Sequence, residues 1–191
     1  MRRIFVSVIL TACLFTSWLS GQAPASARSS FVNRLTSAAI EQTHHRVRSV
    51  PGYVRIPYPN GDVPSDTGVC TDVIIRAYRA AGIDLQKEVH EDMSKSFRAY
   101  PSSWGLSRPD SNIDHRRVPN LATYFRRHGL SLPLSPSPAV YLSGDLVTWD
   151  LGGGVPHIGI VVRQSPTQPL LVHNIGRGPE LKQVLFDWKI T

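Results

Sequence analysis

The sequence contains very little cysteine, with two residues of this type, Cys13 and Cys70, in a chain of 191. Small exported domains that are held together by disulfides use their cysteines in pairs, and this chain does not belong to that class. Cys13 lies in an apolar stretch at the start of the chain, so removal of that stretch would leave one thiol. Because an unpaired thiol is a liability in an oxidising compartment, we expect Cys70 to serve a chemical purpose.

Long hydrophobic runs are also missing. The longest apolar stretch, residues 4–19, contains polar side chains and is shorter than the ~20 apolar residues of a membrane-spanning helix. It follows Arg2 and Arg3 and precedes the small residues of segment 23–27. A basic start, an apolar centre and a small-residue end are typical of a removable secretory signal. The sequence therefore predicts an exported protein without a stable membrane span.

The predicted signal peptide covers residues 1–27 and leaves residues 28–191 as one domain, in the periplasm or outside the cell. This length is enough for a hydrophobic core without disulfides. Cys13 also lies in a segment similar to a lipoprotein processing site, and lipidation there is the alternative. Removal of Arg2 and Arg3 lowers the formal charge from +7 to +5, a surplus that favours anionic envelope components.

Motifs for nucleic acids, metals and phosphates are absent as well. The basic residues form no stripe interleaved with aromatic residues, so we expect no nucleic-acid partner. His44 and His45 lack the further ligands of a zinc site, and we expect neither a metal nor another cofactor. The glycine run 152–154 precedes a predicted strand rather than a helix, which argues against a phosphate-binding loop. We interpret it as a mobile loop over the candidate site.

The spacing of apolar residues changes along the chain. Helical spacing predicts helices over residues 29–47, 71–81 and 85–100, and a short helix that ends at Gly129. After a proline-rich connector, β-branched and aromatic runs predict strands over residues 146–149, 157–162, 170–173 and 183–188. Short spacings between these strands favour antiparallel pairing. The sequence therefore predicts an α+β fold in which a helical N-terminal half packs on an antiparallel β-sheet.

Cys70 lies at the start of the second predicted helix. The positive end of the helix dipole favours a thiolate, so we expect a lowered pKa for this thiol. His157 opens one predicted strand and His173 closes the next, which allows both imidazoles to lie near Cys70. One histidine can then take the thiol proton while a second polar group orients its ring. A small core residue without chemistry is the alternative for Cys70.

These positions resemble two related groups of proteins. Similarity to NlpC-type papain-like cell-wall cysteine peptidases is carried by Tyr58, the Gly61-Asp62 turn, Gly144–Val147 and Pro156–Val161. A closer resemblance, to the YijF-like family of uncharacterised exported bacterial proteins, is carried by Tyr58–Asp72, Ile113–Leu121 and Gly144–Val162. The resemblance implies a papain-like fold and an exported cysteine hydrolase.

The resemblance also implies roles for individual residues. Cys70 would be the nucleophile, His157 the general base and His173 the orienting third residue. Asn174 is the alternative third residue, since neighbouring side chains of a strand point to opposite faces. Tyr58 would line the substrate pocket beside the oxyanion site.

One departure from the NlpC-type pattern concerns substrate binding. Those enzymes carry an aspartate directly before the nucleophile, which binds the free amine of the wall peptide, and Val69 occupies that position here. Asp62, Asp66 and Asp72 are candidates to replace it, and we expect Asp62 and Asp72 to bind substrate together with Tyr58. In the structural interpretation, Asp62 and Asp66 belong to turns and Asp72 to the first turn of a helix.

The expected activity is cleavage of an amide bond, with peptidoglycan stem peptides as the leading substrate. A thiol acyltransferase, or an amidase for another amide-containing envelope substrate, is the alternative among enzymes. A noncatalytic module that binds the envelope is the alternative from another class. Asp114 and His115 are interpreted as a structural, hydrogen-bonded corner.

Overall fold

The computed structural model describes residues 25–191, which form four α-helices and one five-stranded sheet. The predicted signal peptide lies outside the described residues except for its last three positions, and Cys13 lies outside them as well. None of the helices in the described part of the chain is long and apolar enough to cross a membrane.

The helices precede the strands in the chain, as predicted. The α-helices are α1 (Ala25–Glu41), α2 (Cys70–Ala80), α3 (Leu85–Ser96) and α4 (Val118–His128). Short 3-10 turns are η1 (Gln42–His44), η2 (Phe97–Ala99), η3 (Asp114–Arg116) and η4 (Pro138–Val140). The strands are β1 (Leu146–Asp150), β2 (Pro156–Arg163), β3 (Leu170–His173), β4 (Glu180–Lys182) and β5 (Lys189–Ile190).

The central helix α2 owes its boundaries to local signals. Val73, Ile74 and Ala77 repeat at helical spacing and are fully buried. At the start, the backbone N–H of Val69 donates to the Asp72 carboxylate at 2.7 Å, which satisfies one donor that the helix leaves free. Helix α3 begins in the same manner, with the side chain of its N-cap residue Asp84 as acceptor.

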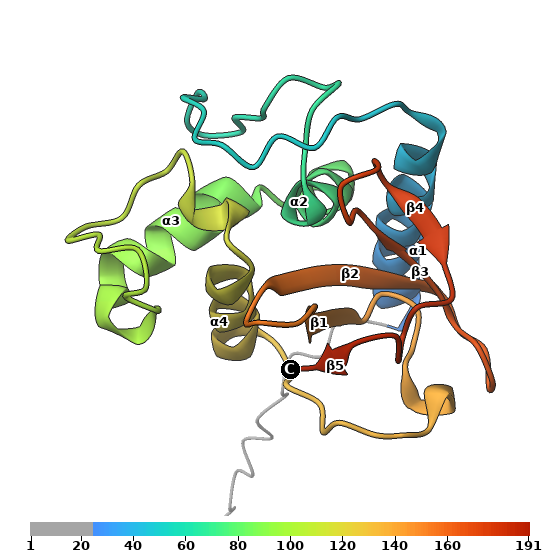
Figure 1. The fold of residues 1–191 in the computed structure, drawn as a ribbon. Coiled ribbons are helices and arrows are strands. Elements are labelled where there is room, and N and C mark those ends of the chain that lie inside the picture. Colours follow the sequence, from blue (N-terminus) through green and yellow to red (C-terminus); the bar gives the residue numbers. More distant parts are fainter. Residues whose placement is uncertain (1–24) are drawn as a thin grey trace, which may run out of the picture.

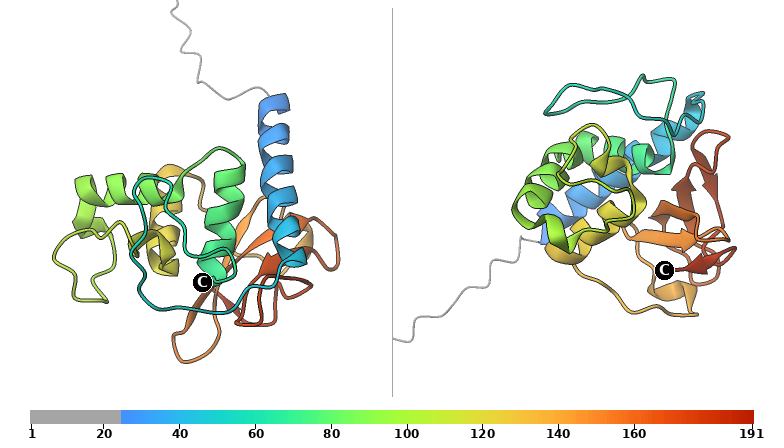
Figure 2. Two further views of the ribbon diagram at one scale, coloured as in Figure 1. Left: turned by 90° about the horizontal axis from the view of Figure 1, so that it is seen from above. Right: turned by 60° about the vertical axis from the view of Figure 1, so that its left-hand side comes forward.

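The sheet is antiparallel, with strand order β4-β3-β2-β1-β5. Each face of the sheet packs against a different apolar cluster. Ile158, Ile160 and Val172 point to the face that packs on the helices, and α1, α2 and α4 all contact β2 (Figure 1). The right-hand view of Figure 2 shows the helices on one side and the strands on the other. Trp149 and Leu171 point to the opposite face, where Leu185 completes a second apolar cluster.

Three predicted elements differ from the structure. The predicted helix 29–47 ends at Glu41 and continues as the single turn η1, and the predicted helix 85–100 ends at Ser96 and continues as η2. The predicted strand 183–188 is a turn between β4 and β5. The backbone N–H of Asp187 donates to the Val184 carbonyl at 3.2 Å, which closes a turn here, and Val184 and Leu185 are both buried. The carbonyl of Leu185 instead accepts a hydrogen bond from the Trp149 indole at 2.9 Å.

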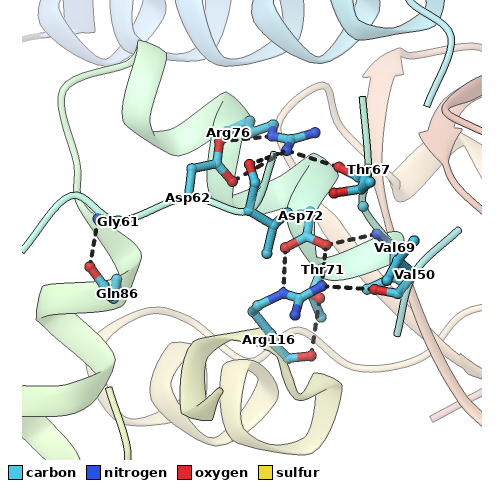
Figure 3. A network of polar contacts seen from close by, with 12 residues as sticks. Val50, Gly61, Asp62, Thr67, Val69, Thr71, Asp72, Arg76, Gln86 and Arg116 are labelled. Carbon is cyan, nitrogen blue, oxygen red and sulfur yellow. Dashed lines mark hydrogen bonds and ion pairs between the residues drawn. The ribbon is translucent and has the colours of Figure 1, made fainter. Parts of the chain in front are cut away.

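A buried ion pair joins the start of α2 to the rest of the helical half (Figure 3). Both carboxylate oxygens of Asp72 accept from the Arg116 guanidinium at 2.9 Å, and the two side chains are 3% and 2% exposed. Arg116 also donates to the carbonyls of Val50 and Gly52. Thr71 donates to the Arg116 carbonyl at 3.1 Å, so side chains and backbone act together. This network fixes the first turn of α2, and therefore Cys70, relative to two distant loops.

We predict that Arg116→Met destabilises the protein by about 3–5 kcal/mol, because it leaves the Asp72 carboxylate buried without a partner. Urea unfolding followed by circular dichroism measures the effect. Asp66→Asn is the matched control, since it breaks an exposed ion pair with Arg48, and its effect should be far smaller. Equal losses from the two variants would contradict a structural role of the buried pair.

Candidate active site

Cys70 is the first residue of α2, and its side chain is partly buried. It packs against the hydrophobic core between the helices and the sheet. The backbone N–H groups of Ile158 and Thr71 are near enough to its sulfur to favour the thiolate and lower its pKa. Since Ile158 directly follows His157 in β2, the thiol lies where the start of α2 meets the start of that strand.

The predicted lowering of the thiol pKa is wrong for this structure. Burial is the main cause that raises the pKa of Cys70 to about 11, and the negative charge of Asp72 acts in the same direction. The backbone N–H groups of Ile158 and Thr71 favour the thiolate, but the loss of hydration outweighs them. The resting thiol is therefore neutral at pH 7.

His157 and His173 lie on neighbouring strands and contact each other. Nε2 of His157 and Nδ1 of His173 are 3.0 Å apart, which is a hydrogen-bonding distance. The register explains the contact, because His173 pairs with Gly159, two positions beyond His157, and all three residues face the same side. Both imidazoles are buried. The structure thus brings the predicted base and the predicted third residue together.

The thiol and the imidazoles reach the site from opposite faces of the sheet. Cys70 packs with the helices, whereas His157 and His173 share the other face with Trp149. Within residues 25–191, no hydrogen bond joins the Cys70 sulfur to either imidazole. Such contacts are often long in ligand-free enzymes and tighten when substrate binds. Nδ1 of His157 is the ring nitrogen that does not contact His173.

Both histidines are neutral at pH 7. Burial lowers the pKa of His157 to about 4, and the neighbouring His173 lowers it in the same direction. Burial also lowers the pKa of His173, while the carboxylate of Glu180 opposes this shift. In this state the imidazole is an unprotonated base and the thiol is an unionised acid. No proton has been transferred between them.

Two tryptophans enclose the histidine pair. The Trp149 ring centroid lies 5.6 Å from that of His157, and the Trp188 centroid lies 5.8 Å from that of His173. A side chain at Gly159 would meet the Trp149 ring at 3.1 Å, so glycine allows this close approach. The rings restrict the orientation of both imidazoles and exclude water, which accounts for the lowered pKa values.

Asn174 has a different role from His173. Its Nδ2 donates to the Gly68 carbonyl at 3.3 Å, and its Oδ1 accepts from the backbone N–H groups of Gly176 and Gly178. Asn174 therefore ties the loop after β3 to the segment that precedes Cys70. The position in contact with His157 belongs to His173.

The predicted substrate-binding carboxylates are engaged in ion pairs. Asp62 pairs with Arg76 at 2.9 Å and with Arg79 at 3.1 Å. Asp66, the further candidate, pairs with Arg48 at 2.8 Å. These contacts support the structural interpretation of both residues, and the assignment of Asp62 to substrate stays a prediction.

Asp72 is not available to a substrate either, because Arg116 and the Val69 N–H use its carboxylate in the buried network. Its position in the first turn of α2 agrees with the structural interpretation. All three candidates for the carboxylate that is missing before the nucleophile are thus paired with arginines.

Tyr58 contacts α3 rather than the histidine pair. Its ring lies edge to face against His90, with centroids 5.1 Å apart, and is 43% exposed. Burial and the charge of Glu91 raise the pKa of its hydroxyl. The structure therefore does not support the predicted place of Tyr58 beside an oxyanion site at Cys70.

Sequence reasoning missed Trp149, Trp188 and Arg116. Trp149 ends the predicted strand 146–149, so alternation along that strand could have placed it opposite His157. Arg116 lies 44 positions after Asp72, and no local pattern pairs two residues at that separation.

A cavity between α4 and the sheet lies apart from the cysteine and the histidines. One cavity among the described residues has a volume of about 330 Å³ and is lined by α4, β1 and residues 129–134. Cys70, His157 and His173 do not line it. No group of three or more His, Cys, Asp or Glu side chains within residues 25–191 is arranged to hold a metal ion.

Comparisons with known proteins show what the chain is related to. Residues 36–191 match the family model described as a domain of unknown function, DUF1287. The chain is 54% identical over 143 residues to the uncharacterized protein YijF of Escherichia coli K12, a match that covers 74% of this chain and 70% of that protein. No solved structure matches the chain. The chain therefore belongs to the DUF1287 family and is similar to YijF.

Proposed function

We propose that this protein is an exported cysteine hydrolase with a papain-like fold that cleaves an amide bond. The observation that carries the proposal is the 3.0 Å contact between His157 and His173 beside the strand position that adjoins Cys70. A thiol at a helix start, a base on the neighbouring strand and a residue that orients the base form the working set of such enzymes. The packing of the Cys70 helix on an antiparallel sheet supports the papain-like assignment.

The neutral resting state determines the first chemical step. As the Cys70 sulfur attacks the amide carbonyl carbon, its proton moves to Nδ1 of His157, and a carbon–sulfur bond forms. His173 accepts a hydrogen bond from Nε2 of the resulting imidazolium and stabilises its charge. The backbone N–H of Cys70, the first residue of α2, would donate to the developing oxyanion.

The second step releases the products. Nδ1 of His157 returns the proton to the amide nitrogen, the carbon–nitrogen bond breaks, and a thioester remains on Cys70. Water then attacks the thioester with His157 as base, which releases the carboxylic acid and restores the thiol. If an amine replaces water in this step, the same site acts as a thiol acyltransferase.

Peptidoglycan stem peptides remain the leading substrate, because they supply amide bonds in the compartment to which the predicted signal directs the chain. The structure modifies how such a substrate would be recognised. Asp62, Asp66 and Asp72 are all paired with arginines, so none is free to bind a substrate amine.

A noncatalytic envelope-binding module is the second candidate. Two observations favour it: the raised pKa of the Cys70 thiol, and the lack of a hydrogen bond from Cys70 to either histidine in the described part of the chain. In that case the cysteine is a core residue and the histidine pair is structural.

Turnover separates the two candidates. We predict that Cys70→Ala and His157→Ala each reduce release of fragments from whole peptidoglycan by at least about 100-fold, as measured by mass spectrometry. The double variant should lose no more than the single variants, because nucleophile and base act as one unit. His45→Ala changes an exposed histidine and serves as the control. Fragments released equally by Cys70→Ala would exclude this residue as the nucleophile.

Alkylation by iodoacetamide tests the resting state of the thiol. Since only the thiolate reacts and the pKa of Cys70 is raised to about 11, the rate at Cys70 should increase continuously from pH 6 to pH 10. The urea-unfolded protein should follow an ordinary thiol with a pKa of ~8.5. A rate in the folded protein that is already maximal near pH 6 would reveal a thiolate–imidazolium pair and contradict the neutral site.

Blocking the substrate amine tests how the substrate is bound. We predict that acetylation of the free amine of a cleaved stem peptide leaves kcat/KM essentially unchanged, because no unpaired carboxylate is present among the three candidates. A peptide of the same sequence with the free amine is the reference. A loss of about tenfold or more on acetylation would show that a carboxylate of the site binds the amine.

A further inference from the structure

His173 leaves one ring nitrogen without a partner. Its Nδ1 contacts His157, whereas its Nε2 is buried and has no hydrogen-bond partner among residues 25–191. The whole side chain is 2% exposed, so bulk water does not reach it freely. A buried polar atom without a partner costs free energy and calls for an explanation.

The proposed reaction makes this atom important, because the two imidazoles share one proton between them. If Nε2 of His157 carries that proton, Nδ1 of His157 has a free lone pair and can act as the base. Nδ1 of His173 is then the acceptor, and Nε2 of His173 must carry a proton. In the opposite arrangement, Nδ1 of His157 carries a proton and cannot accept another. A hydrogen-bond acceptor at Nε2 of His173 would therefore select the active tautomer.

Glu180 is the residue of the sheet whose carboxylate is placed to accept a hydrogen bond from Nε2 of His173. It is directly opposite His173 in the antiparallel pair of β3 and β4, so the two side chains share a face. Paired residues have Cβ atoms ~5 Å apart, within the reach of a glutamate side chain. The Glu180 side chain is partly buried on the edge strand β4.

Other charged groups also face His173. Lys182 lies on the same strand as Glu180 and disfavours an imidazolium at His173, whereas Asp187, in the turn before β5, favours it. Glu180 exerts the largest effect of the three. His157 faces the ring from β2 and is neutral at pH 7.

We propose that Glu180 is a positioning residue that accepts a hydrogen bond from Nε2 of His173 and thereby holds His157 in the tautomer that can deprotonate Cys70. The relay then runs from Cys70 through His157 and His173 to Glu180. This inference rests on the proposed function, but the tautomer of the histidine pair can be observed without any substrate.

The test is two-dimensional ¹H–¹⁵N NMR of the histidine side chains in the ¹⁵N-labelled protein at pH 7. We expect both His157 and His173 to carry their proton at Nε2. Glu180→Val, which keeps a good strand former but removes the acceptor, should shift both rings toward the Nδ1-protonated form. Glu180→Gln keeps an oxygen acceptor and should retain most of the wild-type tautomer.

Asp187→Asn and Lys182→Gln are matched controls, since each removes one charge that faces the same ring, and neither should change the tautomer. Protonation of His173 at Nδ1 in the wild-type protein, or unchanged spectra in Glu180→Val, would overturn the proposal. A tautomer that follows Asp187→Asn instead would assign the role to Asp187 and overturn it as well.

Activity distinguishes this inference from the proposed function. With an amide substrate, Glu180→Val should lower kcat more than it changes KM, and Glu180→Gln should recover part of the loss. If wild type hydrolyses the substrate and Glu180→Val does so equally well, the relay is wrong while the hydrolase stands. If no hydrolysis is found but the tautomers respond as expected, the relay stands and the hydrolase assignment fails.

Discussion

The buried ion pair between Asp72 and Arg116 is the constraint on which the geometry of the candidate site depends. The Asp72 carboxylate accepts a hydrogen bond from the backbone N–H of Val69, which would otherwise have no partner at the start of α2. The Arg116 guanidinium neutralises the charge of that carboxylate. The guanidinium also holds the carbonyls of Val50 and Gly52. Burial of two charges is favourable only when their hydrogen bonds are satisfied, and here they are. The position of Cys70, two residues before Asp72, follows from this arrangement.

The sheet positions the two histidines of the candidate site, independently of the ion pair that positions Cys70. His157 and His173 are placed by strand register, and the tryptophan rings around them restrict their orientation. Asn174, which directly follows β3, donates to the Gly68 carbonyl in the segment before Cys70 and so connects the sheet to the start of α2. The consequence is a dry site in which thiol and imidazoles are all neutral, so that charge develops only when a substrate is attacked.

The sequence predicted the features that depend on local patterns. The apolar spacing located α2, α3 and α4, and the β-branched runs located the three central strands. Predictions from the sequence were wrong where contacts between residues far apart in the chain determine the structure. The predicted strand 183–188 is a turn, and its Leu185 carbonyl accepts from the distant Trp149 indole. The helix dipole at Cys70 is visible in the sequence, but the loss of hydration that outweighs it depends on tertiary packing. The same holds for Asp62 and Asp72, whose arginine partners no local spacing identifies.

The central claim is that Cys70 attacks an amide carbonyl and carries the acyl group. The most direct measurement is acid quenching of the protein during its reaction with peptidoglycan, followed by mass spectrometry of the peptide that contains Cys70. We expect that peptide to gain the mass of an acyl fragment, and hydroxylamine, which cleaves thioesters, to remove it. If fragments are released while Cys70 stays unmodified at every quench time, and Cys70→Ala releases them as well, the thiol is not the nucleophile and the claim is wrong.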